Sequence, residues 1–251
     1  MKKYRLVWFQ HLHKAAGTYV VRRALTNGEK PYPLNKNGNP HDDKGAIPLW
    51  EMTGEELTEF VDECQELGVT FVATEWGGPD FRKLSEDPRV HLVTCFRHPI
   101  NRFISNFNFD YYWRWTESKN YSEYLSEMEI YSSPEYYTRI FSRNQDPNVE
   151  VKPEDLKRAK ENLQLFDHII IAESGMDDLS KLGWVKESDA THPTFGDKWA
   201  MIHLIKKLRF WRLFQYLLRV KHKPGNEINL EQLNMLDIEL YDYVKSIDNS
   251  I

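Results

Sequence analysis

Residues 4–19 of the 251-residue chain read Tyr-Arg-Leu-Val-Trp-Phe-Gln-His-Leu-His-Lys-Ala-Ala-Gly-Thr-Tyr. The segment from Tyr4 to Leu12 is short, apolar and rich in residues that favour strands, so it predicts a buried β-strand. Small residues then predict a tight turn, and residues 16–25 predict a helix. A buried strand that turns directly into a helix is typical of the opening unit of an α/β protein.

The rest of the chain continues this alternation. Further strands are predicted at Val69–Thr74, Val90–Phe96 and His168–Ala172. Helices are predicted at Thr53–Leu67, Pro99–Trp113, 121–131, 134–143, 153–165, from about Asp177, at Lys198–Arg219 and at Asn229–Ile247. Residues 27–48 are rich in Gly, Asn, Pro and Lys and predict a loop. We expect a single α/β domain over residues 1–251, with a parallel sheet of about four to five strands flanked by helices.

Composition restricts the class of protein. Hydrophobic residues make up 41% and charged residues 28%, as in ordinary globular domains. Two cysteines, Cys64 and Cys95, favour a reducing, cytoplasmic setting. No apolar run is long enough to span a membrane or to serve as the core of a signal peptide. The net charge of −5 argues against a nucleic-acid partner.

The turn at residues 11–19 has the chemistry of an anion cradle. Small residues let backbone N–H groups approach an anion, and the start of a helix adds unpaired donors and partial positive charge. Lys14 supplies a full charge and Thr18 a hydroxyl. The lysine precedes the Gly-Thr pair, so the segment is not a Walker A loop. An ordinary strand–helix turn with a surface lysine is the alternative interpretation.

A second candidate anion site follows the Val90–Phe96 strand. Residues 97–107 read Arg-His-Pro-Ile-Asn-Arg-Phe-Ile-Ser-Asn-Phe. Arg97 stands at the predicted strand end, Pro99 begins the helix, and Ser105 lies about two turns along it. Arginine and serine suit a second phosphate group. The alternative is an arginine paired with a carboxylate beside a solvated helix face.

Together, the two segments resemble the nucleotide signatures of the sulfotransferase superfamily. Residues 13–18 are similar to its Pro-Lys-x-Gly/Ala-Gly-Thr loop, which binds the 5′-phosphosulfate. Residues 97–105 are similar to its Arg-Asp-Pro-x-x-Arg-x-x-Ser motif, which binds the 3′-phosphate. Softer similarity to the carbohydrate-type branch covers 135–139, 166–173 and 229–243. His13 and His98 depart from the usual Pro and Asp, but Lys14 and Arg97 are retained.

The resemblance implies a P-loop-like fold and an enzyme that transfers a sulfuryl group from 3′-phosphoadenosine 5′-phosphosulfate (PAPS), leaving 3′-phosphoadenosine 5′-phosphate (PAP). It implies that Lys14 stabilises the bridging oxygen as its bond to sulfur breaks, and that no metal is needed. The residues expected to hold the donor are Lys14, Ala15, Ala16, Gly17, Thr18, Tyr19, Arg97, Ser105 and Arg139.

Such a transfer needs a general base, and three residues are candidates. Glu75 follows the Val69–Thr74 strand, where related carbohydrate enzymes carry a His or a carboxylate, so position favours it. His11 and His13 are the alternatives. A surface acid in a Gly-rich turn and structural histidines are the competing interpretations.

The acceptor is less defined by the sequence. We expect a hydroxyl of a small-molecule natural product or a sugar-like compound, with a nitrogen as an option and a polysaccharide as the alternative. Residues 107–115 are rich in aromatic side chains that suit stacking or a core. Residues 198–223 carry eight Lys or Arg and no acid, interleaved with apolar residues. They predict a basic amphipathic helix that contacts an acidic partner or a membrane surface, or simply forms a solvated face.

Two other classes remain as rivals. An ATP-dependent P-loop-type kinase would need magnesium and lacks the Walker A order here. A non-catalytic nucleotide-binding or partner-binding protein would not need Lys14, Thr18, Arg97 and Ser105 together.

Overall fold

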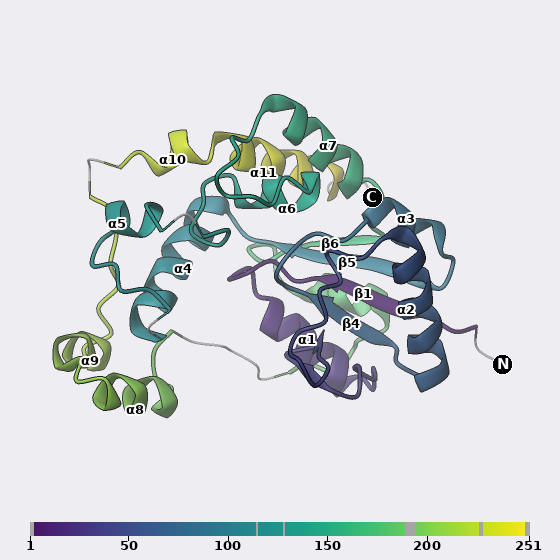
Figure 1. Ribbon diagram of the computed structural model, residues 1–251, viewed down its shortest axis with the longest axis horizontal. Coiled ribbons are helices and arrows are strands. Elements are labelled where there is room, and N and C mark those ends of the chain that lie inside the picture. The colour runs from purple at the N-terminus through teal and green to yellow at the C-terminus, as the bar shows by residue number, and fades with distance from the viewer. Residues whose placement is uncertain (1–2, 114, 128, 189–193, 226–227, 249–251) are drawn as a thin grey trace.

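The computed structural model describes residues 3–113, 115–127, 129–188, 194–225 and 228–248. Its central sheet has four parallel strands in the order β4-β1-β5-β6. The bounds are β1 Leu6–Gln10, β4 Phe71–Thr74, β5 Val90–Phe96 and β6 His168–Ile171. The chain therefore has the predicted α/β architecture, a parallel sheet flanked by helices (Figure 1).

Helices flank this sheet and extend beyond it at one end (Figure 1). The helices are α1 Gly17–Thr26, α2 Gly54–Leu67, α3 Phe81–Glu86, α4 Pro99–Trp113, α5 Tyr121–Leu125, α6 Tyr136–Ser142, α7 Pro153–Leu163, the 3₁₀ helix η1 Asp177–Leu182, α8 Lys198–Lys206, α9 Phe210–Leu217, α10 Leu230–Leu233 and α11 Met235–Asp248. In Figure 1, α6, α7 and α11 lie together along one side of the sheet. Helices α8 and α9 lie beyond α4, at the end of the long axis opposite to α2 and α3.

The sheet is buried on both faces. Every residue of β1 and β4 is buried, as expected for parallel strands covered by helices. On one face Phe9 and Val93 pack with α1 and Trp184, and on the other Trp8 packs with α2. This rigid layer fixes the positions of the loops that leave the carboxyl ends of the strands.

Several predicted boundaries are confirmed and others are corrected. The strand Val90–Phe96 and the helix Pro99–Trp113 have the predicted bounds. Thr53 and Glu56 form the predicted capping box of α2. The helices expected over 121–131 and 134–143 are shorter, and α3 was not predicted. The helix expected at Asn229–Ile247 is divided into α10 and α11 because Asn234, its side chain bonded to Leu230 O, leaves helical geometry.

The segment 27–48 is not entirely a loop. It contains a small antiparallel pair, β2 Asn35–Lys36 and β3 Asn39–Pro40. Asn37 and Gly38 join the strands with positive φ values of 50° and 81°, as in the tight turns that favour Asn-Gly. The hairpin docks on the sheet because Ala73 N donates to Gly38 O.

The single basic helix expected over residues 198–223 is wrong. The chain forms α8 and α9, and residues 220–225 continue without helix. Leu208 adopts a left-handed φ of 55°, and Arg209 N donates to Leu204 O, which closes the end of α8. The left-handed position of such a turn is usually glycine. Because this chain has leucine there, the sequence gives no signal for the turn. Among the described helices, none is long and apolar enough to cross a membrane.

Candidate anion-binding and catalytic site

A cavity of about 1120 Å³ opens at the carboxyl ends of the strands, where α/β proteins bind ligands. It is lined by most of the residues singled out from the sequence: His11, His13, Lys14, Ala16, Gly17, Thr18, Tyr19, Glu75, Arg97 and Ser105. Segments that lie more than 80 positions apart in the chain therefore contribute to one site.

The turn before α1 is built as a nest of backbone donors. Lys14 and Ala16 both adopt left-handed backbone geometry, with φ of 61° and 66°. This conformation is strained for residues other than glycine and clusters at functional sites. No side chain caps α1, and among the described residues the N–H groups of Gly17 and Thr18 have no acceptor. Such a concave, uncapped helix start suits a phosphate or sulfate.

Gly17 is required by a close approach rather than by its φ angle. A Cβ atom at this position would lie 1.7 Å from Cδ2 of His11 and 1.9 Å from its Nε2. The ring of His11 therefore packs directly on the backbone of the nest. Any side chain at position 17 would displace either the ring or the turn.

Lys14 is held in a setting that disfavours its charge. Its Nζ lies 3.9 Å from the centre of the Phe109 ring. Burial lowers the pKa of Lys14 to about 8; Asp110 opposes this change and Arg97 adds to it. An anion in the cavity would favour the charged form of Lys14 further, as the nearby Asp110 already does.

Arg97 connects the nest to the start of α4. One of its guanidinium nitrogens donates a long, weak hydrogen bond of 3.4 Å to Lys14 O. Its own backbone N–H and carbonyl are both bonded to the Tyr137 hydroxyl, at 3.3 and 2.7 Å. Ser105 and Asn101 line the same cavity from α4. The cavity thus has, besides the nest, a second group of side chains whose chemistry suits an anion.

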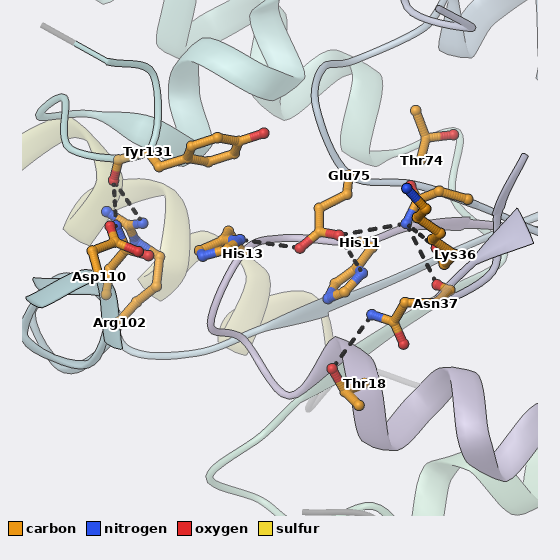
Figure 2. A network of polar contacts seen from close by, with 12 residues as sticks. His11, His13, Thr18, Lys36, Asn37, Thr74, Glu75, Arg102, Asp110 and Tyr131 are labelled. Carbon is orange, nitrogen blue, oxygen red and sulfur yellow. Dashed lines mark hydrogen bonds and ion pairs between the residues drawn. The ribbon is translucent and has the colours of Figure 1, made fainter. Parts of the chain in front are cut away.

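Glu75 stands between two histidines. Its Oε1 is 3.0 Å from His13 Nδ1, and its Oε2 is 3.6 Å from His11 Nδ1. Figure 2 shows both rings directed at this carboxylate. Burial favours the neutral acid, but the charge of His11, the hydrogen bond from His13 and that from Asn39 outweigh it and lower the pKa of Glu75 to about 2. Such a carboxylate is a weak proton acceptor and a strong hydrogen-bond acceptor.

Two tyrosines of α6 hold in place the turns that carry His13 and Arg97. The Tyr136 hydroxyl accepts from His13 N at 3.1 Å, and Tyr137 binds the backbone of Arg97. Helices α6 and α11 cap each other. Asp237 accepts from the N–H groups of Tyr137 and Thr138, while Glu135 accepts from those of Leu236 and Asp237. The segments 135–139 and 229–243 therefore brace the site without lining it.

Two predicted donor-binding residues lie elsewhere. Arg139 is buried, and its guanidinium donates to the carbonyls of Pro134, Asp146 and Val149. This corrects its assignment to the donor site, because those bonds join the segment before α6 to the loop after it. The side chain of Ala15 is buried in the core next to Leu12, so only its backbone belongs to the turn.

Some cavity residues were not singled out from the sequence. Asn37, from the β2–β3 hairpin, donates to the Thr18 hydroxyl at 3.4 Å (Figure 2). Glu173, after β6, accepts from His98 N and from the Tyr241 hydroxyl. The Asn-Gly pair at 37–38 was a readable hairpin signal. The contact with Thr18 was not, because it depends on where the hairpin docks.

The histidines and carboxylates do not form a metal centre. Within the part of the chain that the structure describes, no three His, Cys, Asp or Glu side chains are arranged to hold a metal ion. A scan against protein-family models finds no match to this chain, and a search of curated proteins finds none either.

Proposed function

We propose that this protein is a PAPS-dependent sulfotransferase that acts on a hydroxyl of a small-molecule or sugar-like acceptor. The observation that carries the proposal is the meeting, in one cavity, of the strained nest around Lys14 with the Arg97–Ser105 group. PAPS has two anionic ends, a 5′-phosphosulfate and a 3′-phosphate. Two separate sets of anion-binding groups fit such a donor better than a ligand with one phosphate.

Different residues would bind the two ends of the donor and accept the proton of the acceptor. The N–H groups of Gly17 and Thr18 and the ammonium of Lys14 would hold the 5′ end, and Arg97 and Ser105 the 3′-phosphate. Bound PAPS supplies an electrophilic sulfur: the acceptor oxygen bonds to it as the sulfur–oxygen bond to PAP breaks. His13 would take the acceptor proton at Nε2, because Glu75 holds its Nδ1. The geometry thus favours His13 as the base, whereas position in the sequence alone favoured Glu75.

A second hollow supports the acceptor class. It has a volume of about 730 Å³ and begins at Trp76, directly after Glu75. Trp50 and Trp76 line it with ring centres 6.0 Å apart, and Gln145 and Glu129 add polar groups. Gly77 makes room for these walls, since a Cβ there would lie 2.2 Å from Gln145 Oε1. Aromatic faces with a few polar groups suit a sugar ring or a flat alcohol.

The first test is calorimetric titration with PAP in the absence of magnesium. Wild-type protein is expected to bind PAP at least about 100-fold more tightly than AMP, because AMP has no 3′-phosphate for Arg97 and Ser105. Arg97→Ala is expected to remove most of that difference while leaving AMP binding nearly unchanged.

Arg82→Ala is the matched control for the loss of an arginine. Arg82 is exposed on α3 and lines neither the donor cavity nor the hollow at Trp76. Equal binding of PAP and AMP by the wild-type protein would contradict the proposed donor. Turnover of ATP that requires magnesium would support the kinase alternative instead.

The affinity for PAP is expected to depend on pH through Lys14. The ammonium form binds the anion, and its pKa is lowered to about 8 in the free protein, chiefly by burial. Affinity should be constant from pH 7 to about pH 8 and then fall by up to about tenfold per pH unit, as the free lysine loses its proton. Titration at several pH values measures this slope.

Lys14→Arg is the control, because a guanidinium keeps its charge over this range. A flat profile is expected for this variant. A wild-type affinity that does not change up to pH 9.5 would contradict a contact between Lys14 and the donor.

A further inference from the structure

Helix α9 has its apolar side directed away from the protein. The exposed large side chains are Phe210, Trp211, Phe214, Leu217 and Leu218. Their spacing places them on one face of the helix. The opposite face, which packs on α4, carries the buried side chains of Arg212 and Tyr216. This arrangement is the reverse of that of an ordinary surface helix.

Arg212 fixes this orientation. Its guanidinium lies 4.0 Å from the centre of the Tyr111 ring and donates to four carbonyls, those of Tyr111, Thr116, Glu117 and Ser118. Tyr216 is anchored as well, since its hydroxyl is bonded to Asp197 N and O. A rotation that buried the apolar face would break all of these bonds. The outward direction of the apolar face is therefore specified by the fold.

Helix α8 and the turn after it extend the same surface. Trp199, Ile202 and Ile205 are exposed, while Ala200 and Leu204 face the protein. Leu208, at the turn, is 72% exposed and adopts strained left-handed geometry, where glycine is the usual residue. We call the exposed apolar side chains of residues 199–218 the α8–α9 face. So large an exposed apolar surface marks a binding site.

Charge decides between possible occupants of the α8–α9 face. Exposed cations accompany it: Lys198, Lys206, Lys207, Arg219, Lys221 and Lys223. Residues 198–223 contain no Asp or Glu, although the whole chain has a net charge of −5. A second copy docked on this face would bring like charges together. A partner that presents negative charge next to an apolar phase would match both the cations and the exposed apolar side chains of the α8–α9 face.

We propose that the α8–α9 face docks on an anionic lipid membrane. The tryptophan and phenylalanine side chains would enter the boundary between headgroups and acyl chains, and the lysines would contact the phosphates. None of the described helices can span a bilayer, so this contact lies in the plane of the interface. It is independent of the proposed transfer reaction, because the cavity that contains Lys14 includes no residue of 198–223.

The test is co-sedimentation of the full chain with vesicles. Binding is expected to vesicles of phosphatidylcholine with about one-third phosphatidylserine, and to be at least about tenfold weaker without the anionic lipid or at high salt. Trp211→Ser/Phe214→Ser is expected to weaken binding to the anionic vesicles by at least about tenfold. Both residues are exposed, so the thermal unfolding midpoint should stay near that of the wild type.

Leu34→Ser/Val185→Ser is the matched control, because it also removes two exposed apolar side chains, from other parts of the surface. It should bind anionic vesicles like the wild type. Absence of binding by the wild type, or binding that Trp211→Ser/Phe214→Ser leaves unchanged, would overturn the proposal. So would a wild-type dimer that the same double variant dissociates and that ignores vesicles, since a second copy would then be the occupant.

Discussion

Replacing Lys14 with alanine is expected to lower kcat by about 10²–10³-fold, the loss typical of removing one group that stabilises developing oxygen charge. The ammonium is positioned by the left-handed backbone at residue 14 and by the Phe109 ring. Because its pKa is already lowered to about 8 by burial, a nearby negative charge that grows during the reaction would interact with it strongly. Steady-state kinetics with PAPS and an accepted alcohol measure the effect.

Lys36→Ala is the control for this prediction. Lys36 is exposed on the β2–β3 hairpin and does not line the cavity, although its neighbours Asn35 and Asn37 do. It should retain wild-type kcat. A kcat for Lys14→Ala within a factor of about three of the wild type would exclude the lysine from charge stabilisation.

Replacing His13 with asparagine is expected to reduce kcat by about 10²–10⁴-fold, the usual contribution of a general base. The carboxylate of Glu75, whose pKa in the wild type is lowered to about 2 by its histidine partners against the effect of burial, is still present in this variant. Steady-state kinetics with PAPS and an accepted alcohol measure the effect.

Glu75→Gln distinguishes the base from its positioning partner. If Glu75 orients His13, Glu75→Gln should reduce kcat less than His13→Asn does. If Glu75 accepts the proton itself, Glu75→Gln should be the more damaging of the two variants.

The parts of the fold that the sequence predicted well are those set by local signals. β5 ends and α4 begins at Arg97-His98-Pro99, where an apolar run ends and is followed by a proline, a residue that suits the first turn of a helix. The nest around Lys14 was also predictable, because small residues followed a buried strand. Its strain was not, since Lys14 and Ala16 give no sign of left-handed geometry.

Tertiary contacts account for what the sequence did not reveal. Arg139 stands in a segment that resembles a motif of carbohydrate-type sulfotransferases. Its guanidinium, however, donates to the carbonyl of Pro134 before α6 and to those of Asp146 and Val149 after it. The basic segment 198–223 has the composition of one helix. The turn that divides it shows in the structure, through the left-handed Leu208 and the bond from Arg209 N to Leu204 O. The relation of His13 to Glu75 also depends on the order of strands, which places β4 beside β1.

The mutual capping of α6 and α11 has a consequence for biosynthesis. The hydroxyls of Tyr136 and Tyr137 hold the turns that carry His13 and Arg97, and Asp237 holds the start of α6. On the ribosome, residues 13 and 97 emerge long before residue 237. Folding from the N-terminus can therefore form the sheet early, but the two turns lack their brace until α11 has emerged. A nascent chain interrupted before residue 237 should lack PAP binding although every residue proposed to hold the donor has been made.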